Sequence, residues 1–106
     1  MKESIYQKLE ALKERHEELR VLLSTEAVIN VPNKYRALAK EYAELDPIMA
    51  VFDTYLESIK TQQVAMELLN DPDLEMQNLA KVELQQSQKL QVTLSEQLYR
   101  LLLPKD

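Results

Sequence analysis

Apolar residues recur every three or four positions at the start of this chain, which is the spacing of one face of an α-helix. Charged residues occupy the opposite face. The pattern predicts a first helix over about residues 3–23, with Ser4 and Gln7 forming a capping box at its start. The apolar seam of this helix comprises Ile5, Leu9, Leu12, His16, Leu19 and Leu23.

A longer seam with the same spacing predicts a second helix over about residues 34–69. Pro47 stands inside this seam, and Asp46–Pro47 would suit the cap and first position of a new helix. Because the seam passes the proline in register, we favour one long helix kinked near Pro47, and a full break there is the alternative. The seam runs through Tyr35, Leu38, Tyr42, Leu45, Met49, Phe52, Leu56, Ile59, Gln63 and Met66.

A third seam predicts a helix over about residues 73–103. Asn70 or Asp71 would cap it ahead of Pro72, and Pro104 would end it. Residues 85–88 are polar, which indicates partial exposure of the centre of the helix. Residues 28–33 are predicted to form a loop. The apolar positions of this seam are Leu74, Leu79, Leu90, Leu94, Leu98 and Leu101.

These three helices predict a single all-α domain over residues 1–106. Short connections between consecutive helices favour antiparallel neighbours. The first helix is shorter than the other two, so we expect an antiparallel three-helix bundle along its length and a two-helix coiled-coil arm beyond it. The turn at 70–73 would form one tip of that arm, and the loop at 28–33 would lie toward the opposite end.

Composition narrows the classes of function. The chain has no glycine, which argues against phosphate-cradling loops and Rossmann-type nucleotide sites. It has no cysteine, which fits a reducing compartment, and its net charge of −5 gives no footprint for sequence-specific nucleic-acid binding. No apolar run approaches the roughly 20 residues of a membrane helix. We therefore expect a cytoplasmic protein that binds neither membranes nor a cofactor.

The candidate chemical groups point to packing and not to catalysis. His16 is the single histidine and lies on an apolar seam, so a packing or hydrogen-bonding role is expected. No Glu-x-x-His pair is available for a bundle metal site, and the Glu residues are expected to pair with Lys or Arg on the same helix. Tyr35, Tyr42 and Tyr55 are interpreted as core or core-edge aromatics. We expect a contact module with no catalytic or metal site, and not an enzyme.

Three segments resemble the N-terminal domain of bacterial peptide chain release factor 1, the class I factor that acts at UAA and UAG codons. They are KLEALKERHEELRVLLS at 8–24, YRALAKEYAELDPI at 35–48 and LLLPKD at 101–106. In that family a Gly-Gly-Gln loop promotes peptidyl-tRNA hydrolysis and a Pro-x-Thr tripeptide reads the codon. Neither motif occurs here. The resemblance thus implies the N-terminal helical domain of a longer protein, with a linker beginning near Pro104.

The resemblance also implies a partner, a protein at the base of the ribosomal stalk near the GTPase-associated centre. Asn70, Asp71 and Asp73 at the tip of the arm are the candidate contact residues, and the competing interpretation is that they only reverse the chain. The alternative function is a stand-alone coiled-coil adaptor or homo-oligomerisation module. We expect the chain by itself to be mainly a monomer or a weak dimer.

Overall fold

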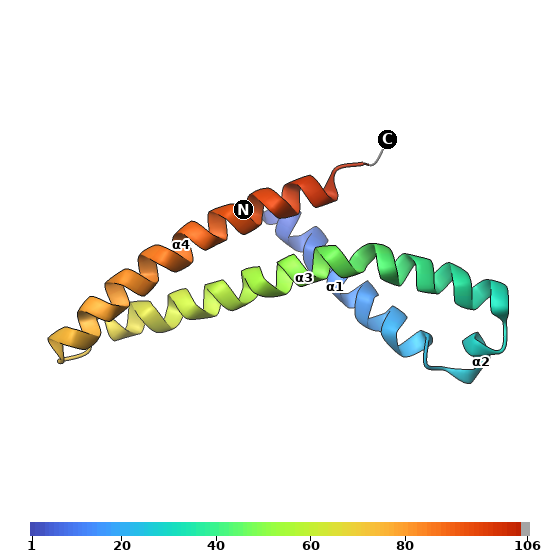
Figure 1. The fold of residues 1–106 in the computed structure, drawn as a ribbon, viewed down its shortest axis with the longest axis horizontal. Coiled ribbons are helices and arrows are strands. Elements are labelled where there is room, and N and C mark those ends of the chain that lie inside the picture. Colours follow the sequence, from blue (N-terminus) through green and yellow to red (C-terminus); the bar gives the residue numbers. More distant parts are fainter. Residues whose placement is uncertain (105–106) are drawn as a thin grey trace. The chain divides into compact units, whose positions relative to one another are not determined.

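The chain folds into four α-helices joined by short connections (Figure 1). The structure is a computed structural model that describes residues 1–104. The all-α prediction is confirmed, and no strand occurs within these residues. The linker expected after Pro104 runs into Lys105 and Asp106, which lie outside the described part. The helices are α1 (Glu3–Leu22), α2 (Glu26–Ile29), α3 (Pro32–Leu68) and α4 (Leu74–Leu102).

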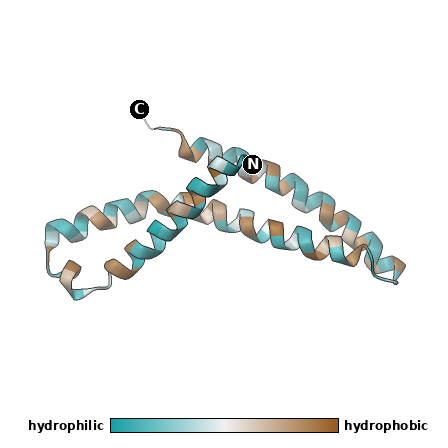
Figure 2. Cartoon of the chain, turned by 180° about the vertical axis from the view of Figure 1, so that it is seen from behind, coloured by the Kyte–Doolittle hydropathy of each residue, from teal (hydrophilic) through white to brown (hydrophobic). Residues whose placement is uncertain are grey.

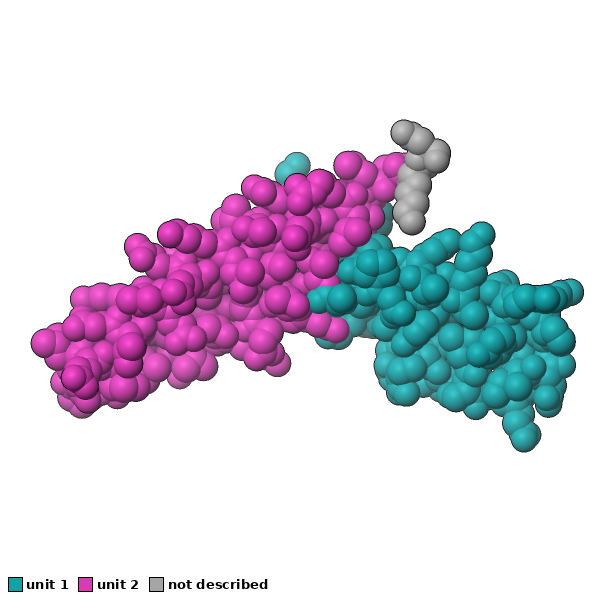
Figure 3. Space-filling model, viewed as in Figure 1, with its two compact units in different colours: residues 1–50 teal, residues 51–106 magenta. Residues whose placement is uncertain are grey.

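The helices group into two compact units, residues 1–50 and residues 51–106 (Figure 3). The boundary falls inside α3, between Ala50 and Val51, so each unit contains one part of that helix. The first unit holds α1, α2 and the start of α3. The second unit holds the remainder of α3 and the whole of α4.

Helix α1 begins without the predicted capping box. Its N-cap is Lys2, which makes no side-chain cap hydrogen bond, and Ser4 already lies within the first turn. Gln7 donates from Nε2 to the Glu3 carboxylate at 3.3 Å instead of bonding back to the backbone. Glu3 in the first turn complements the positive end of the helix dipole. The predicted seam of α1 is confirmed, because all six of its residues are buried or half-buried.

The connection between α1 and α3 contains a helical turn that the sequence did not predict. Helix α2 occupies part of the expected loop, and Val28 within it is only 2% exposed. β-branched residues have low helix propensity, so tertiary burial of Val28 decides the conformation here. Pro32 then takes the first position of α3, where a missing N–H has no effect on the helix.

Helix α3 is continuous through Pro47, so the alternative of a full break there is wrong. Proline removes one backbone hydrogen bond from a helix interior. Leu45 and Met49 on either side of it are both buried, which favours continuing the helix across the defect. Asp46 lies inside the helix, and its carboxylate contacts His16 of α1 rather than capping a new helix.

In the second unit, α3 and α4 form an antiparallel two-helix arm. Gln91 of α4 donates from Nε2 to Gln62 Oε1 of α3 at 2.6 Å and to the Ser58 carbonyl at 3.4 Å. The buried positions of α4 include Ala80, Ser87, Leu94 and Leu98, and those of α3 include Tyr55, Ser58 and Ala65. Four of these seven positions are alanine or serine, which allows the two helices to approach closely there.

The predicted seams of the arm are wrong over much of its length. Beyond Phe52, the buried face of α3 is displaced by one position, so Ala65 is buried while Met66 is 53% exposed. In α4, only Leu94 and Leu98 of the predicted seam are buried. The partial exposure expected at 85–88 also fails at Ser87, which is 4% exposed. Figure 2 shows the resulting mixture of apolar and polar turns along the helices. The predicted seam positions of α4 that prove to be exposed are Leu74, Leu79, Leu90 and Leu101.

Helix α4 ends just before Pro104, as the sequence predicts. Leu103 has ψ of 143°, the extended conformation that Pro104 imposes on its neighbour. Within residues 1–104, no helix combines the length and the apolar character required to cross a bilayer.

Candidate functional site

The turn between α3 and α4 carries the candidate contact residues Asn70, Asp71 and Asp73. Asn70 is exposed, and Asp71 is half-buried. Asp71 accepts a hydrogen bond on Oδ1 from the backbone N–H of Asp73 at 2.8 Å, and its carbonyl accepts from Gln77 Nε2 at 2.6 Å. These bonds hold the turn from both sides, so Asp71 has a definite local role in reversing the chain.

Asp73 is the N-cap of α4, a position that the sequence analysis assigned to Asn70 or Asp71. Its Oδ1 accepts from the backbone N–H of Glu75 at 2.9 Å, which satisfies one of the free amides at the helix start. Pro72 therefore precedes the cap instead of following it. Each of the two aspartates uses one carboxylate oxygen within the turn.

The tip also concentrates negative charge beside an apolar side chain. Residues 67–75 contain four carboxylates and neither lysine nor arginine. Leu74, directly after the cap, is 66% exposed. The negative charge of this surface repels phosphate. A basic protein surface could pair with the carboxylates and pack on the apolar side chain between them. The structure thus brings the three predicted residues together, with two of them engaged in local bonds.

A second polar group joins α1 to α3 in the first unit. Arg15 donates from Nε to Glu41 Oε2 at 2.6 Å and from Nη2 to Glu41 Oε1 at 2.8 Å, while Nη1 donates to Glu18. The hydrogen bond from Arg15 lowers the pKa of Glu41, and the same contact raises the pKa of Arg15. The bidentate geometry fixes the register of the two helices.

His16 lies next to this pair and confirms the packing and hydrogen-bonding role predicted for it. Its ring stacks on Tyr42 with centroids 4.3 Å apart and planes 11° apart. Nε2 lies 2.6 Å from Asp46 Oδ1. Both partners come from α3, so the imidazole contributes to the packing of α1 against α3. Tyr55 is buried and Tyr42 half-buried as predicted, whereas Tyr35 is 39% exposed, which makes that assignment wrong.

The sequence analysis found the charge pairs within a helix but missed the pair between helices. Arg20 binds Glu17, three positions before it, and lowers the pKa of that carboxylate. Such pairs follow from spacing alone. The pair between Arg15 and Glu41 spans 26 positions and becomes visible only when the two seams are aligned in antiparallel register.

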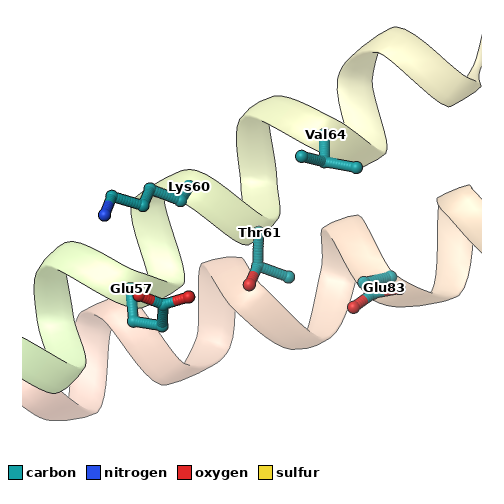
Figure 4. A pocket seen from close by; sticks show the side chains of 5 residues that line it. All are labelled: Glu57, Lys60, Thr61, Val64 and Glu83. Carbon is teal, nitrogen blue, oxygen red and sulfur yellow. The ribbon is translucent and has the colours of Figure 1, made fainter.

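The arm has a shallow groove on one side, between the exposed edges of α3 and α4. One part is lined by Glu57, Lys60, Thr61 and Val64 of α3 with Glu83 of α4 (Figure 4). The adjoining part shares Thr61 and Glu83. The two parts measure about 200 Å³ and about 180 Å³ and are open to solvent, whereas small-molecule sites enclose most of their ligand. The sequence analysis did not find this groove, since no single helix contains it.

Nothing in the described residues assembles into a metal centre. Within residues 1–104, no group of three or more His, Asp or Glu side chains converges closely enough to hold an ion. The carboxylates in this part of the chain instead form pairs, which include Arg15 with Glu18 and Glu41, Arg20 with Glu17, and His16 with Asp46.

Comparison with known proteins identifies the domain. No solved structure matches the chain significantly. The PCRF domain, a domain of class I peptide chain release factors, matches residues 12–106. The matched region begins within α1 and includes the Arg15–Glu41 ion pair, the turn at 70–73 and the whole of α4. The PCRF domain is not by itself a catalytic fold. The chain therefore belongs to the PCRF domain family, which indicates a release-factor-like role in translation termination.

Proposed function

We propose that this chain is the ribosome-contacting domain of a peptide chain release factor that acts at UAA and UAG codons in the cytoplasm. The observation that carries the proposal is the match of the PCRF domain to residues 12–106. The sequences of residues 8–24, 35–48 and 101–106 support the UAA/UAG factor in particular. The hydrolysis loop and codon-reading tripeptide of such a factor would lie outside these residues.

The tip of the arm is the proposed contact, and its partner is a basic protein at the base of the ribosomal stalk. Four carboxylates within residues 67–75 make a direct contact with rRNA phosphates unfavourable. The same charges favour a protein surface rich in lysine and arginine. Asn70 and the free carboxylate oxygens of Asp71 and Asp73 are the polar groups that such a surface would meet.

Two different substitutions at the tip separate a contact role from a turn-forming role. Asp71→Asn with Asp73→Asn keeps an acceptor oxygen at both positions and removes two charges. We expect this variant to keep its thermal stability within a few degrees and to bind purified bacterial ribosomes several-fold more weakly in co-sedimentation. Glu44→Gln with Glu96→Gln removes two exposed carboxylates elsewhere and should bind like the wild type. Equal loss of binding in both variants would contradict a contact at the tip.

The alternative, a coiled-coil adaptor, is tested by the association state of the chain. We propose that it is mainly a monomer or a weak dimer, because its net charge of −5 opposes self-association. Sedimentation equilibrium over a range of concentrations and at two ionic strengths would measure this directly. A tight oligomer that persists at low concentration would favour the adaptor.

A further inference from the structure

The groove along the arm is lined by residues that the ribosome contact proposed above does not use. Two carboxylates line it from opposite helices, Glu57 on α3 and Glu83 on α4, and both are exposed. Neither forms an ion pair within the described residues. Val64 and Leu90, which line the same groove, are 55% and 43% exposed.

The polar and apolar groups alternate along the groove. On α3, Glu57, Thr61 and Val64 are four and three positions apart, so they share one edge of the helix. On α4, Glu83 and Leu90 are one heptad apart and lie on the facing edge. Figure 4 shows Glu83 facing the Thr61–Val64 end of the groove, with Glu57 farther along and Lys60 extending away from α4. Each edge thus offers one carboxylate and one apolar side chain. Lys60 on α3 also lines the groove, so its lining carries two negative charges and one positive charge.

We propose that this groove binds a cationic amphipathic helix of a partner protein, which lies along the arm as a third helix. Apolar side chains of that helix would pack on Val64 and Leu90, and its lysines or arginines would pair with Glu57 and Glu83. Ser58 and Ser87 are small and buried, so α3 and α4 lie close together. The groove between them is therefore shallow, and it suits a helix lying along it better than a single inserted side chain.

The negative charge of the arm favours a cationic helix over a second copy of the arm or a nucleic acid. The described part of the second unit contains eight carboxylates and four lysines or arginines, so a second copy of this arm would bring like charge to the groove. Nucleic acid is disfavoured for the same reason. The groove is shallow and open to solvent, which disfavours a metabolite because small-molecule sites bury most of the ligand surface. The proposal concerns a face separate from the tip and holds whether or not the tip contacts the ribosome.

A designed peptide pair tests the proposal with the whole chain. The probe is a helical peptide of roughly 14 residues, about 20 Å long, with leucines on one face and lysines flanking them. Its counterpart has glutamates in place of the lysines. In nitrogen-15 spectra of the protein, the lysine peptide should shift the amides of residues 57–64 and 83–90 saturably. The glutamate peptide should leave them unchanged.

Matched variants then assign the binding to the groove. Glu57→Gln with Glu83→Gln should weaken the lysine peptide roughly five- to tenfold, as expected for two solvent-exposed ion pairs. Leu90→Gln should weaken it without changing the net charge. Glu44→Gln with Glu96→Gln removes two exposed carboxylates outside the groove and should bind like the wild type at the same ionic strength.

Several results would overturn the proposal. They are the absence of saturable shifts in the wild-type protein, equal binding of the glutamate peptide, and equal weakening by the Glu44 and Glu96 control. Saturable shifts of the same amides by a single-stranded RNA oligonucleotide would also contradict it. Circular dichroism of each variant shows whether the helices are intact, and Leu90→Gln tests the groove without the charge change.

Discussion

Arg15 of α1 holds both carboxylate oxygens of Glu41 of α3, through Nε at 2.6 Å and Nη2 at 2.8 Å. The two residues are 26 positions apart, so the pair sets the register of α1 against α3. His16, the next residue of α1, meets Asp46 and Tyr42 of α3 and supports the same register. Both side chains of the pair are about one-third exposed, which limits the stability it provides at high salt.

The first prediction concerns the pH dependence of that pair. The hydrogen bond from Arg15 lowers the pKa of Glu41 below its usual value of 4.5. A carboxylate with a lowered pKa in the folded state stabilises the fold above 4.5, and this contribution is lost as the pH falls through the folded-state pKa. We therefore expect the urea midpoint of the wild type to fall more between about pH 6 and pH 3 than that of Glu41→Gln.

The control for this experiment is Glu44→Gln, which removes an exposed carboxylate from the same helix. Its pH profile should stay close to that of the wild type. Parallel profiles for the wild type and Glu41→Gln would show that the pair does not contribute to acid stability.

The second prediction separates a buried leucine of α4 from an exposed one. Leu98 is fully buried, whereas Leu79 is 63% exposed although both lie on the seam predicted from sequence. Leu98→Ala should reduce the free energy of unfolding by about 2–4 kcal/mol because it leaves a cavity. Leu79→Ala should change it by less than about 0.5 kcal/mol. Chemical denaturation measures both, and similar losses would mean that α4 packs on its leucine stripe.

The third prediction tests the small-residue interface of the arm. Ala80 is 1% exposed, so a leucine side chain at this position has no space between α3 and α4. Ala80→Leu should destabilise the fold by about 1–3 kcal/mol through overpacking, even though leucine is a good helix former. Gln85→Leu, on the exposed side of α4, is the matched control and should have little effect. Stabilisation by Ala80→Leu would contradict the close approach of the two helices.

The fourth prediction tests Asp73 as the cap of α4. Asp73→Ala removes the acceptor for the Glu75 amide and should destabilise the fold by about 1 kcal/mol. Asp73→Asn keeps an oxygen acceptor and should retain most of that stability, since asparagine caps helices about as well as aspartate. Thermal unfolding compares the two variants. Equal losses would indicate that the charge, and not the cap, stabilises the start of α4.

The sequence predicted the helical fold because its apolar periodicity is strong where large residues are buried, as at Leu9, Leu19, Leu45 and Phe52. It failed over much of the arm because many of the buried positions there are alanine and serine, such as Ser58, Ala65 and Ala80. A search for an apolar stripe then selects the exposed leucines of α4 instead. Continuity through Pro47 was favoured correctly from the unbroken seam. The start of α1 and the turn at Val28 depend on local hydrogen bonds and tertiary burial that spacing does not encode.

The turn that carries the candidate contact residues was predicted in position but not in detail. Proline and aspartate around position 72 mark a turn in any helical chain, so Asn70, Asp71 and Asp73 could be placed together. Which aspartate caps α4 depends on backbone angles that only the structure provides. The groove required the pairing of two helices, and so it could not be found from either helix alone.

The most direct test of the proposed ribosomal contact uses the absence of cysteine from this chain. Asn70→Cys places a single thiol at the exposed tip, where a photo-activated cross-linker can be attached. On bacterial ribosomes stalled at a UAA codon, we predict a cross-link to a protein at the base of the stalk, and none from Gln85→Cys. Cross-links to rRNA or to proteins distant from the stalk, or no ribosome-dependent product from Asn70→Cys, would contradict the account.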